Sequence, residues 1–216
     1  MTIFYFVVAT FPIALYFLAL ACVYGRTTPL VVGGRRDFFA LCLALSGVFF
    51  IGPGQLLATW GASVVWGKYV WILIASFYLF GATFASYFVR PRLIVYNVGW
   101  EALRKTLTTT AIELDDDSRW SGAALNMPGL GAQFYVESGL GRVATIARIG
   151  SFASVDGWNR FSRALAAALR VGEKSKGRKE RALFLIVGFA LFVADSYCVL
   201  HFRDAFQDAA NFYLSF

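Results

Sequence analysis

The chain has 216 residues, of which 58% are hydrophobic and 15% are charged, and its formal net charge is +7. A soluble globular protein is about 45–50% apolar and about 25% charged, so the composition excludes an ordinary soluble protein. The apolar residues are concentrated in four long runs, and most of the charge lies between them. The sequence therefore predicts an integral membrane α-helical bundle of four transmembrane helices with an inserted α+β cytosolic domain.

Each of the four apolar runs is long enough to cross a bilayer as a helix, which requires about 20 residues. The runs cover residues 2–25, 38–61, 69–89 and 182–202. The first run lacks a basic start and exceeds the apolar stretch of a secretory signal, about 7–15 residues, so we interpret it as a spanning helix. Small residues four apart, such as Gly81 and Ala85 in the third run, predict close contact between helices.

The second run contains the triplet Gly52, Pro53 and Gly54, which predicts a kink or an end of the helix. Broken helices mark the binding sites of some transporters, so the triplet is a candidate functional feature. The alternative is a kink near the outer surface without such a role, and this is the interpretation that we favour.

Basic residues predict the orientation in the membrane. The first loop carries Arg26, Arg35 and Arg36, and a basic cluster precedes the fourth run, at Lys174, Lys176, Arg178, Lys179 and Arg181. Lys and Arg near the ends of spanning helices stay on the cytoplasmic side. We therefore expect a bacterial cytoplasmic membrane protein with both termini outside and residues 90–181 in the cytosol. The basic cluster is also a candidate contact for anionic lipid, and topology marking explains it equally well.

Residues 90–172 are expected to form the α+β domain, an antiparallel sheet covered by two helices in the order β-α-β-β-β-α. The expected strands cover residues 93–96, 119–125, 130–137 and 142–149, with a turn at 126–129. Asn97 is the expected cap of a helix over 100–114, and Ser154 or Asp156 caps the last helix. The apolar stripes predict a core of Trp100, Leu103, Leu107, Phe134, Val136, Trp158, Phe161 and Leu165.

The remaining segments complete the predicted organisation. The first three spanning helices occupy residues 1–89, a basic juxtamembrane linker occupies 173–181, and the fourth spanning helix occupies 182–202. Residues 203–216 read as an amphipathic C-terminal tail, suited to the outer membrane interface or to the surface of a partner.

The residues that carry most enzyme chemistry are scarce. His201 is the single histidine of the chain, and the cysteines lie inside apolar runs as expected small buried hydrophobes, at Cys22, Cys42 and Cys198. This composition speaks against a haem, a zinc site and a Ser-His-Asp triad. Residues 61–68 resemble a P-loop with one residue too many, and residues 139–144 match a dinucleotide fingerprint but precede a strand.

Asp195 is the charged residue deep within an apolar run. A charge at the centre of a spanning helix costs about 2.5–3.5 kcal/mol on insertion scales, so such a residue is a candidate for function. The functional interpretation is that Asp195 binds and transfers protons or cations. The alternatives are a hydrogen bond to a Tyr, Ser or Thr of a neighbouring helix, a salt bridge to a partner subunit, or access to water near the surface.

The sequence favours a non-catalytic accessory or scaffold subunit of a larger membrane complex, acting through helix packing and a cytosolic docking domain. Its expected partners are membrane lipids and a membrane protein or a second copy of the chain. We expect no enzyme activity, no cofactor and no nucleic acid, because the aromatic residues of the domain lie on predicted core faces. The alternative is a small transporter or channel component that uses Asp195 and the break at residues 52–54.

Overall fold

The structure, a computed structural model, describes residues 2–59, 67, 69–139, 141–149, 155–171 and 177–214. Its contacts divide the chain into two compact units. Residues 1–20, 38–88 and 183–216 form the first, which we call the helical unit, and residues 21–37 and 89–182 form the second, the sheet unit. The first loop, which the sequence left outside the α+β domain, therefore belongs to the sheet unit.

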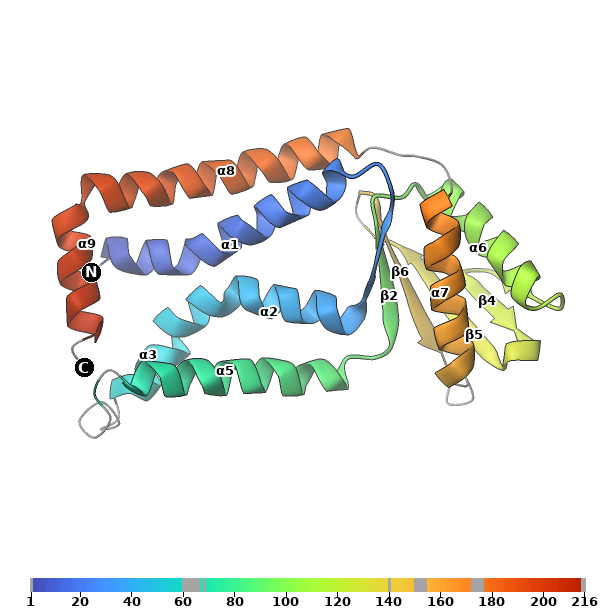
Figure 1. The fold of residues 1–216 in the computed structure, drawn as a ribbon, viewed down its shortest axis with the longest axis horizontal. Coiled ribbons are helices and arrows are strands. Elements are labelled where there is room, and N and C mark those ends of the chain that lie inside the picture. Colours follow the sequence, from blue (N-terminus) through green and yellow to red (C-terminus); the bar gives the residue numbers. More distant parts are fainter. Residues whose placement is uncertain are drawn as a thin grey trace. The chain divides into compact units, whose positions relative to one another are not determined.

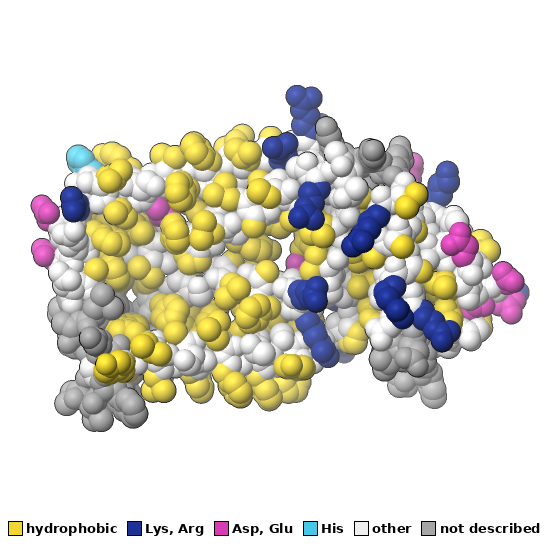
Figure 2. Space-filling model, in the orientation of Figure 1, with side chains coloured by type: hydrophobic (Ala, Val, Ile, Leu, Met, Phe, Trp, Pro, Cys, Tyr) yellow, Lys and Arg dark blue, Asp and Glu magenta, His cyan; other side chains and the backbone are white. Residues whose placement is uncertain are grey.

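The helical unit is built from long apolar helices (Figure 1). α1 covers Thr2–Gly25, α2 Gly34–Ile51, α3 Pro53–Thr59, α5 Tyr69–Phe88, α8 Arg178–His201 and α9 Arg203–Leu214. Among the described helices, α1, α5 and α8 are long and apolar enough to cross a membrane. Hydrophobic side chains cover much of the visible face of these helices in Figure 2, as expected for surfaces that face lipid.

The second apolar run does not form one continuous helix. α2 ends at Ile51, Gly52 lies in a turn and α3 begins at Pro53, so the break expected at this triplet is present. α2 has 18 residues and carries three charged side chains in its first turn. With this charge it is too polar to count among the helices that could cross a membrane. Residues 60 and 61 of the expected span lie outside the described residues.

Proline and glycine produce the closest contact between α1 and α2. Pro12 in α1 has no N–H, so the carbonyl of Val8 one turn earlier lacks its helical donor. Gly47 of α2 lies against this carbonyl, because a Cβ atom at Gly47 would be 1.9 Å from Val8 O. Only glycine allows so close an approach, which places Cα–H groups beside the freed oxygen.

A second glycine joins α1 to α8. A Cβ atom at Gly188 would be 3.0 Å from the backbone nitrogen of Leu18. Gly81, in contrast, makes no such contact within the chain, since an added Cβ atom there would meet no described atom within 4 Å. The sequence pattern therefore identified Gly81 as a contact residue, but α5 presents it to the surroundings of the chain.

The sheet unit contains a six-stranded antiparallel sheet in the order β1-β2-β6-β5-β4-β3. β1 covers Leu30–Gly33, β2 Arg92–Tyr96, β3 Arg119–Ser121, β4 Ala124–Met127, β5 Ala132–Ser138 and β6 Val143–Ile149. α6 (Trp100–Leu114) and α7 (Val155–Val171) contribute to the same core cluster, so both helices cover one face of the sheet (Figure 1). The antiparallel sheet and its two covering helices agree with the predicted α+β domain, whereas the predicted order with four strands is wrong, since the described sheet has six.

The first loop supplies β1, a strand that the sequence analysis did not predict. β1 pairs antiparallel with β2, from Leu30 opposite Tyr96 to Gly33 opposite Leu93. Four residues between Pro29 and Gly34 are too few to show a strand period. Their strand conformation depends on the hydrogen bonds that β2 offers.

The strand expected over residues 119–125 is wrong, because the chain reverses in the middle of it. Gly122 has a positive φ of 63°, and β3 and β4 form a hairpin in which Ser121 pairs with Ala124. β4 then continues through Met127, so the turn expected at 126–129 begins two residues later, as a 3-10 helix over Pro128–Leu130.

The core of the sheet unit largely matches the predicted set. The fully buried members are Leu103, Leu107, Phe134, Val136, Phe161 and Leu165. Phe134 stacks on Phe161 with ring centroids 4.3 Å apart, and Trp158 packs partly buried against this cluster. The prediction for Trp100 is wrong, since it is 38% exposed. Trp100 is the first residue of α6, and the apolar stripe becomes buried only from Leu103 onward.

The two glycines Gly47 and Gly81 allow a matched test of the helix contact. We expect Gly47→Ala to destabilise the helical unit by about 1–3 kcal/mol, the usual cost of overpacking, because the new Cβ forces α1 and α2 apart. Gly81→Ala adds the same methyl group into open space and should be neutral, or stabilising by up to about 1 kcal/mol through helix propensity. Unfolding of the full-length protein in mild detergent by added SDS measures both. Equal stability of the two variants would contradict the role of Gly47.

Candidate functional site

Asp195 forms a hydrogen-bonded contact between α8 and α1. It is 3% exposed, and its Oδ1 lies 2.6 Å from the Thr10 hydroxyl oxygen of α1. A bond to a neighbouring helix was one of the alternatives for Asp195, and it is the one that this geometry supports. Thr10 itself was not singled out from the sequence, because the two residues are 185 positions apart.

The Thr10 hydroxyl lies between two oxygen acceptors. It lies 2.6 Å from Oδ1 of Asp195 and 2.7 Å from the carbonyl oxygen of Phe6. A hydroxyl has one proton to donate, so Thr10 donates it to one of these oxygens or shares it between them. The other oxygen of Asp195, Oδ2, is buried without a hydrogen-bond partner among the described residues, which is costly for a carboxylate.

The break at Gly52, Pro53 and Gly54 is explained by the backbone. Pro53 cannot donate to the carbonyl of Phe49, and a Cβ atom at Gly54 would be 3.1 Å from that oxygen. Backbone bonds continue on both sides, from Gly52 N to Val48 O at 3.0 Å and from Leu56 N to Gly52 O at 3.4 Å. Among the described residues, no hydrogen bond joins the triplet to Asp195, so the geometry does not bring them together in one site.

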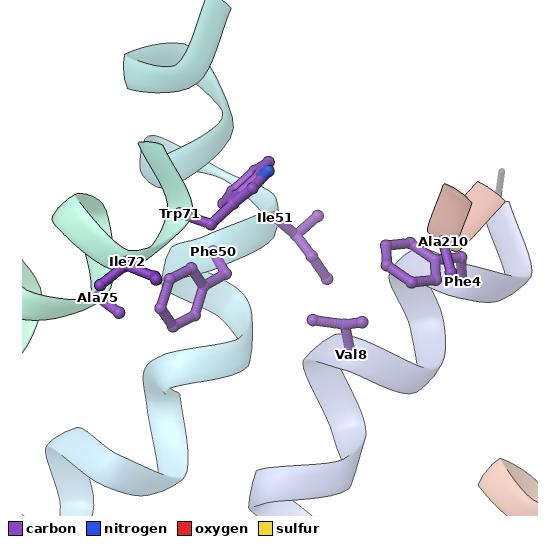
Figure 3. Close-up of a pocket in the computed structure, with 8 residues that line it drawn as sticks. All are labelled: Phe4, Val8, Phe50, Ile51, Trp71, Ile72, Ala75 and Ala210. Carbon is purple, nitrogen blue, oxygen red and sulfur yellow. The ribbon is translucent and has the colours of Figure 1, made fainter. Parts of the chain in front are cut away.

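An apolar cavity of about 410 Å³ lies among α1, α2, α5 and α9 (Figure 3). It is lined by Phe4, Val8, Phe50, Ile51, Trp71, Ile72, Ala75 and Ala210. Val8 and Ile51 point toward each other across it in Figure 3. The lining residues carry no charge, so the cavity suits an acyl chain or an apolar side chain and offers little to a polar solute.

The amphipathic tail packs on its own bundle. It forms α9, in which Phe206 contacts Phe4 of α1 with ring centroids 5.3 Å apart and Ala209 is 3% exposed. Part of the apolar stripe that the sequence assigned to the membrane interface or to a partner is therefore used within the helical unit.

Asn97 connects three segments of the sheet unit and is not the helix cap that the sequence predicted. The residue before α6 that takes the cap position is Gly99. Asn97 is fully buried with a positive φ of 60°; its Nδ2 donates to the carbonyl of Arg26, and its Oδ1 accepts from the N–H of Gly177. These bonds are 2.7 and 2.8 Å long and hold the first loop and the start of α8 beside β2.

The structure describes three of the five candidate lipid-contact residues. Lys174 and Lys176 lie outside the described residues. Arg178, Lys179 and Arg181 are exposed in the first turn of α8, directly after the anchored Gly177. Their exposure is compatible with lipid contact and with topology marking alike.

The other candidate motifs carry no chemistry in the described chain. Of the described residues, no three His, Cys, Asp or Glu form a possible metal site. Cys42 and Cys198 are half-buried, and Cys22 is exposed instead of buried. The fingerprint at residues 139–144 is followed by β6, so it belongs to a hairpin, and residues 61–66 and 68 of the P-loop-like segment lie outside the described part.

Comparisons with protein-family models, with curated proteins and with solved structures give no match for this chain. The candidate functions therefore depend on the residues and their geometry alone.

Substitutions of Asp195 test its structural role. Asp195→Asn keeps an acceptor oxygen and a similar size, so we expect wild-type stability in detergent. Asp195→Leu removes the acceptor and should cost about 0.6 kcal/mol on average, and up to about 1.7, as for other interhelical hydrogen bonds in membranes. The same variants are reconstituted into vesicles. A proton or cation flux that is present in the wild type and lost in Asp195→Asn would contradict the structural role and favour transport.

Proposed function

We propose that this protein is a non-catalytic accessory or scaffold subunit of a larger membrane complex, acting through helix packing and through its α+β domain as a cytosolic docking domain. The observation that carries the proposal is an unoccupied contact surface on α5, which we call the Gly81 groove. It consists of Gly81 and the exposed rings of Phe77, Phe80, Phe84 and Phe88.

The Gly81 groove continues a stripe of α5 whose earlier residues are packed against α2. Val70 and Ile74 on the same side are buried against Phe49 and Phe50. From Phe77 onward the stripe is open, and the four phenylalanines are 56–73% exposed. Their spacing of three or four residues places them on one helical face.

The shape of this surface favours another transmembrane helix as its occupant. Phe80 and Phe84 stack at 6.2 Å, and Phe84 meets Phe88 edge-on at 5.0 Å, so the rings form a continuous wall. Gly81 lies on the same side without a described neighbour. Association inside a bilayer depends on close packing, since lipid is as apolar as the helix. A glycine beside aromatic side chains provides such packing for a partner helix.

Strand pairing supports four crossings of the membrane. β1 follows α1 and β2 follows α5, and the two strands pair, so the ends of α1 and α5 belong on the same side. If α5 crosses the membrane, its start lies on the opposite side, and residues 34–68 must cross once between them. α2 is about 27 Å long at 1.5 Å per residue, and together with α3 it is long enough for the hydrocarbon core of about 30 Å.

The distribution of basic residues supports a cytosolic sheet unit. β1 and β2 bring the first loop and the segment after α5 together, and both carry arginines. Such residues remain on the cytoplasmic side of a membrane. The orientation that follows has both termini outside, as the sequence predicts.

Cysteine accessibility in intact cells tests this topology, starting from a variant without the three native cysteines. We expect an impermeant thiol reagent to label Tyr69→Cys at the start of α5 and Gln207→Cys in α9. Glu101→Cys, exposed on α6 of the sheet unit, should be labelled only after permeabilisation. Labelling of Glu101→Cys in intact cells would contradict the orientation, and protection of Tyr69→Cys would contradict the crossing by α2 and α3.

The scaffold proposal is tested by filling the Gly81 groove. We expect Gly81→Leu to release the partner, because the leucine occupies the space for the other helix, while the stability of the chain itself is retained. Ala190→Leu on the exposed face of α8 is the matched control and should keep the complex. Complex size is measured on native gels after extraction in mild detergent, together with site-specific photocrosslinking from position 80. A complex that survives Gly81→Leu, with no crosslink at position 80, would contradict the proposal.

A second candidate function is a small transporter or channel component. The observation in its favour is the buried Oδ2 of Asp195, which has no hydrogen-bond partner among the residues that the structure describes. An intramembrane acid with a free oxygen could accept a proton or a cation. The Asp195→Asn flux measurement described above separates this candidate from the scaffold.

A further inference from the structure

Four arginines from three segments of the sheet unit line one cavity of about 520 Å³. Arg35 and Arg36 belong to the first turn of α2, Arg92 begins β2, and Arg148 lies near the end of β6. The pairing of β2 with β6 joins the last two, and the N–H of Arg148 donates to the carbonyl of Pro91 at 3.2 Å. The pairing of β1 with β2 brings the start of α2 to the same place.

Among the described residues, the lining of this arginine cavity contains no acidic side chain. Asp37, the acid next to the arginine pair, accepts a hydrogen bond from the hydroxyl of Tyr96. Nε of Arg92 is buried and has no hydrogen-bond partner in the described part of the chain. A buried donor without an acceptor is costly. A bound anion would accept a hydrogen bond from this Nε and remove that cost.

The backbone around Arg92 leaves room for its side chain. A Cβ atom at Gly34 would lie 2.4 Å from Cγ of Arg92 and 3.0 Å from its Nε, so the side chain passes directly over this glycine. Gly34 is also the first residue of α2. The first turn of a helix has N–H groups without helical acceptors and a positive end of the dipole. Guanidinium groups together with such N–H groups are the donors that phosphate prefers.

The chain keeps these arginines close to the membrane. Arg36 is two residues before Phe38, where the second apolar run begins, and Arg92 is four residues after Phe88, the end of α5. At about 3.5 Å per extended residue, these distances are at most about 7 and about 14 Å. The lining also includes Trp158, a residue type that is enriched at the level of lipid headgroups.

We propose that the arginine cavity binds a phosphate group, and that this group belongs to the headgroup of an anionic phospholipid. Soluble phosphate would use the same donors, so the source has to be distinguished by experiment. The proposal concerns the sheet unit and does not depend on the partner helix inferred for the Gly81 groove.

The test measures binding of phosphatidylglycerol to the full-length protein by native mass spectrometry, with lipid titrated into the detergent solution. We expect Arg92→Gln to weaken the apparent affinity about tenfold, the usual effect of losing one charge-assisted hydrogen bond. Arg148→Gln and Gly34→Ala, which displaces the Arg92 side chain, should act in the same direction. Phosphatidylcholine, whose choline balances the phosphate charge, should bind more weakly than phosphatidylglycerol to the wild type.

Two controls match these variants. Arg160→Gln removes one exposed arginine from α7, and Gly81→Ala in α5, outside the cavity lining, adds a Cβ atom that meets nothing within 4 Å. Both should keep the wild-type affinity within about twofold, since neither touches the Arg92 donor. Equal weakening by Arg92→Gln, Arg148→Gln and Arg160→Gln would overturn the site, because general surface charge would then explain the binding. Thermal stabilisation by inorganic phosphate that depends on Arg92, without selective lipid binding, would overturn the lipid source.

Discussion

The antiparallel pairing of β1 with β2 determines how the segments between the helices are used. β1 is only four residues long, but its bonds to β2 connect the chain after α1 with the chain after α5. This pairing supports the argument for a crossing by α2 and α3, since it requires the ends of α1 and α5 to lie on one side. It also completes the arginine cavity, because the first turn of α2 follows β1 directly. The loop between α1 and α2 thus becomes part of the sheet unit.

Backbone groups without partners explain much of the packing in the helical unit. An apolar environment offers no water to a free carbonyl, so each proline in a helix leaves an oxygen that needs a close neighbour. Gly47 lies against the oxygen freed by Pro12, and Gly54 lies near the oxygen freed by Pro53. The same reasoning applies to side chains. The carboxyl of Asp195 is buried against Thr10, so it joins α8 to α1 by a hydrogen bond.

The surfaces that remain open differ in character between the two units. In the helical unit, the Gly81 groove is apolar and aromatic, and close packing with a helix is the interaction that it favours. In the sheet unit, the arginine cavity concentrates charge, and a phosphate matches its donors. The two surfaces lie on separate parts of the chain, the first on α5 and the second at the start of α2, β2 and the end of β6.

The sequence by itself determined the features that depend on neighbouring residues, which are the regular spacing of apolar residues in a helix and the residues that break a helix. Three of the four apolar runs predicted helices that are long and apolar enough to span a membrane. Residues 52–54 predicted the helix break, and the stripes of α6 and α7 predicted most of the core. Only the tertiary structure decided the strand β1, the role of Asn97 and the partner of Asp195. Each of these depends on hydrogen bonds between distant segments, which leave no repeat in the sequence. The arginine cavity was hidden for the same reason, because its four side chains are neighbours only after β1, β2 and β6 have paired.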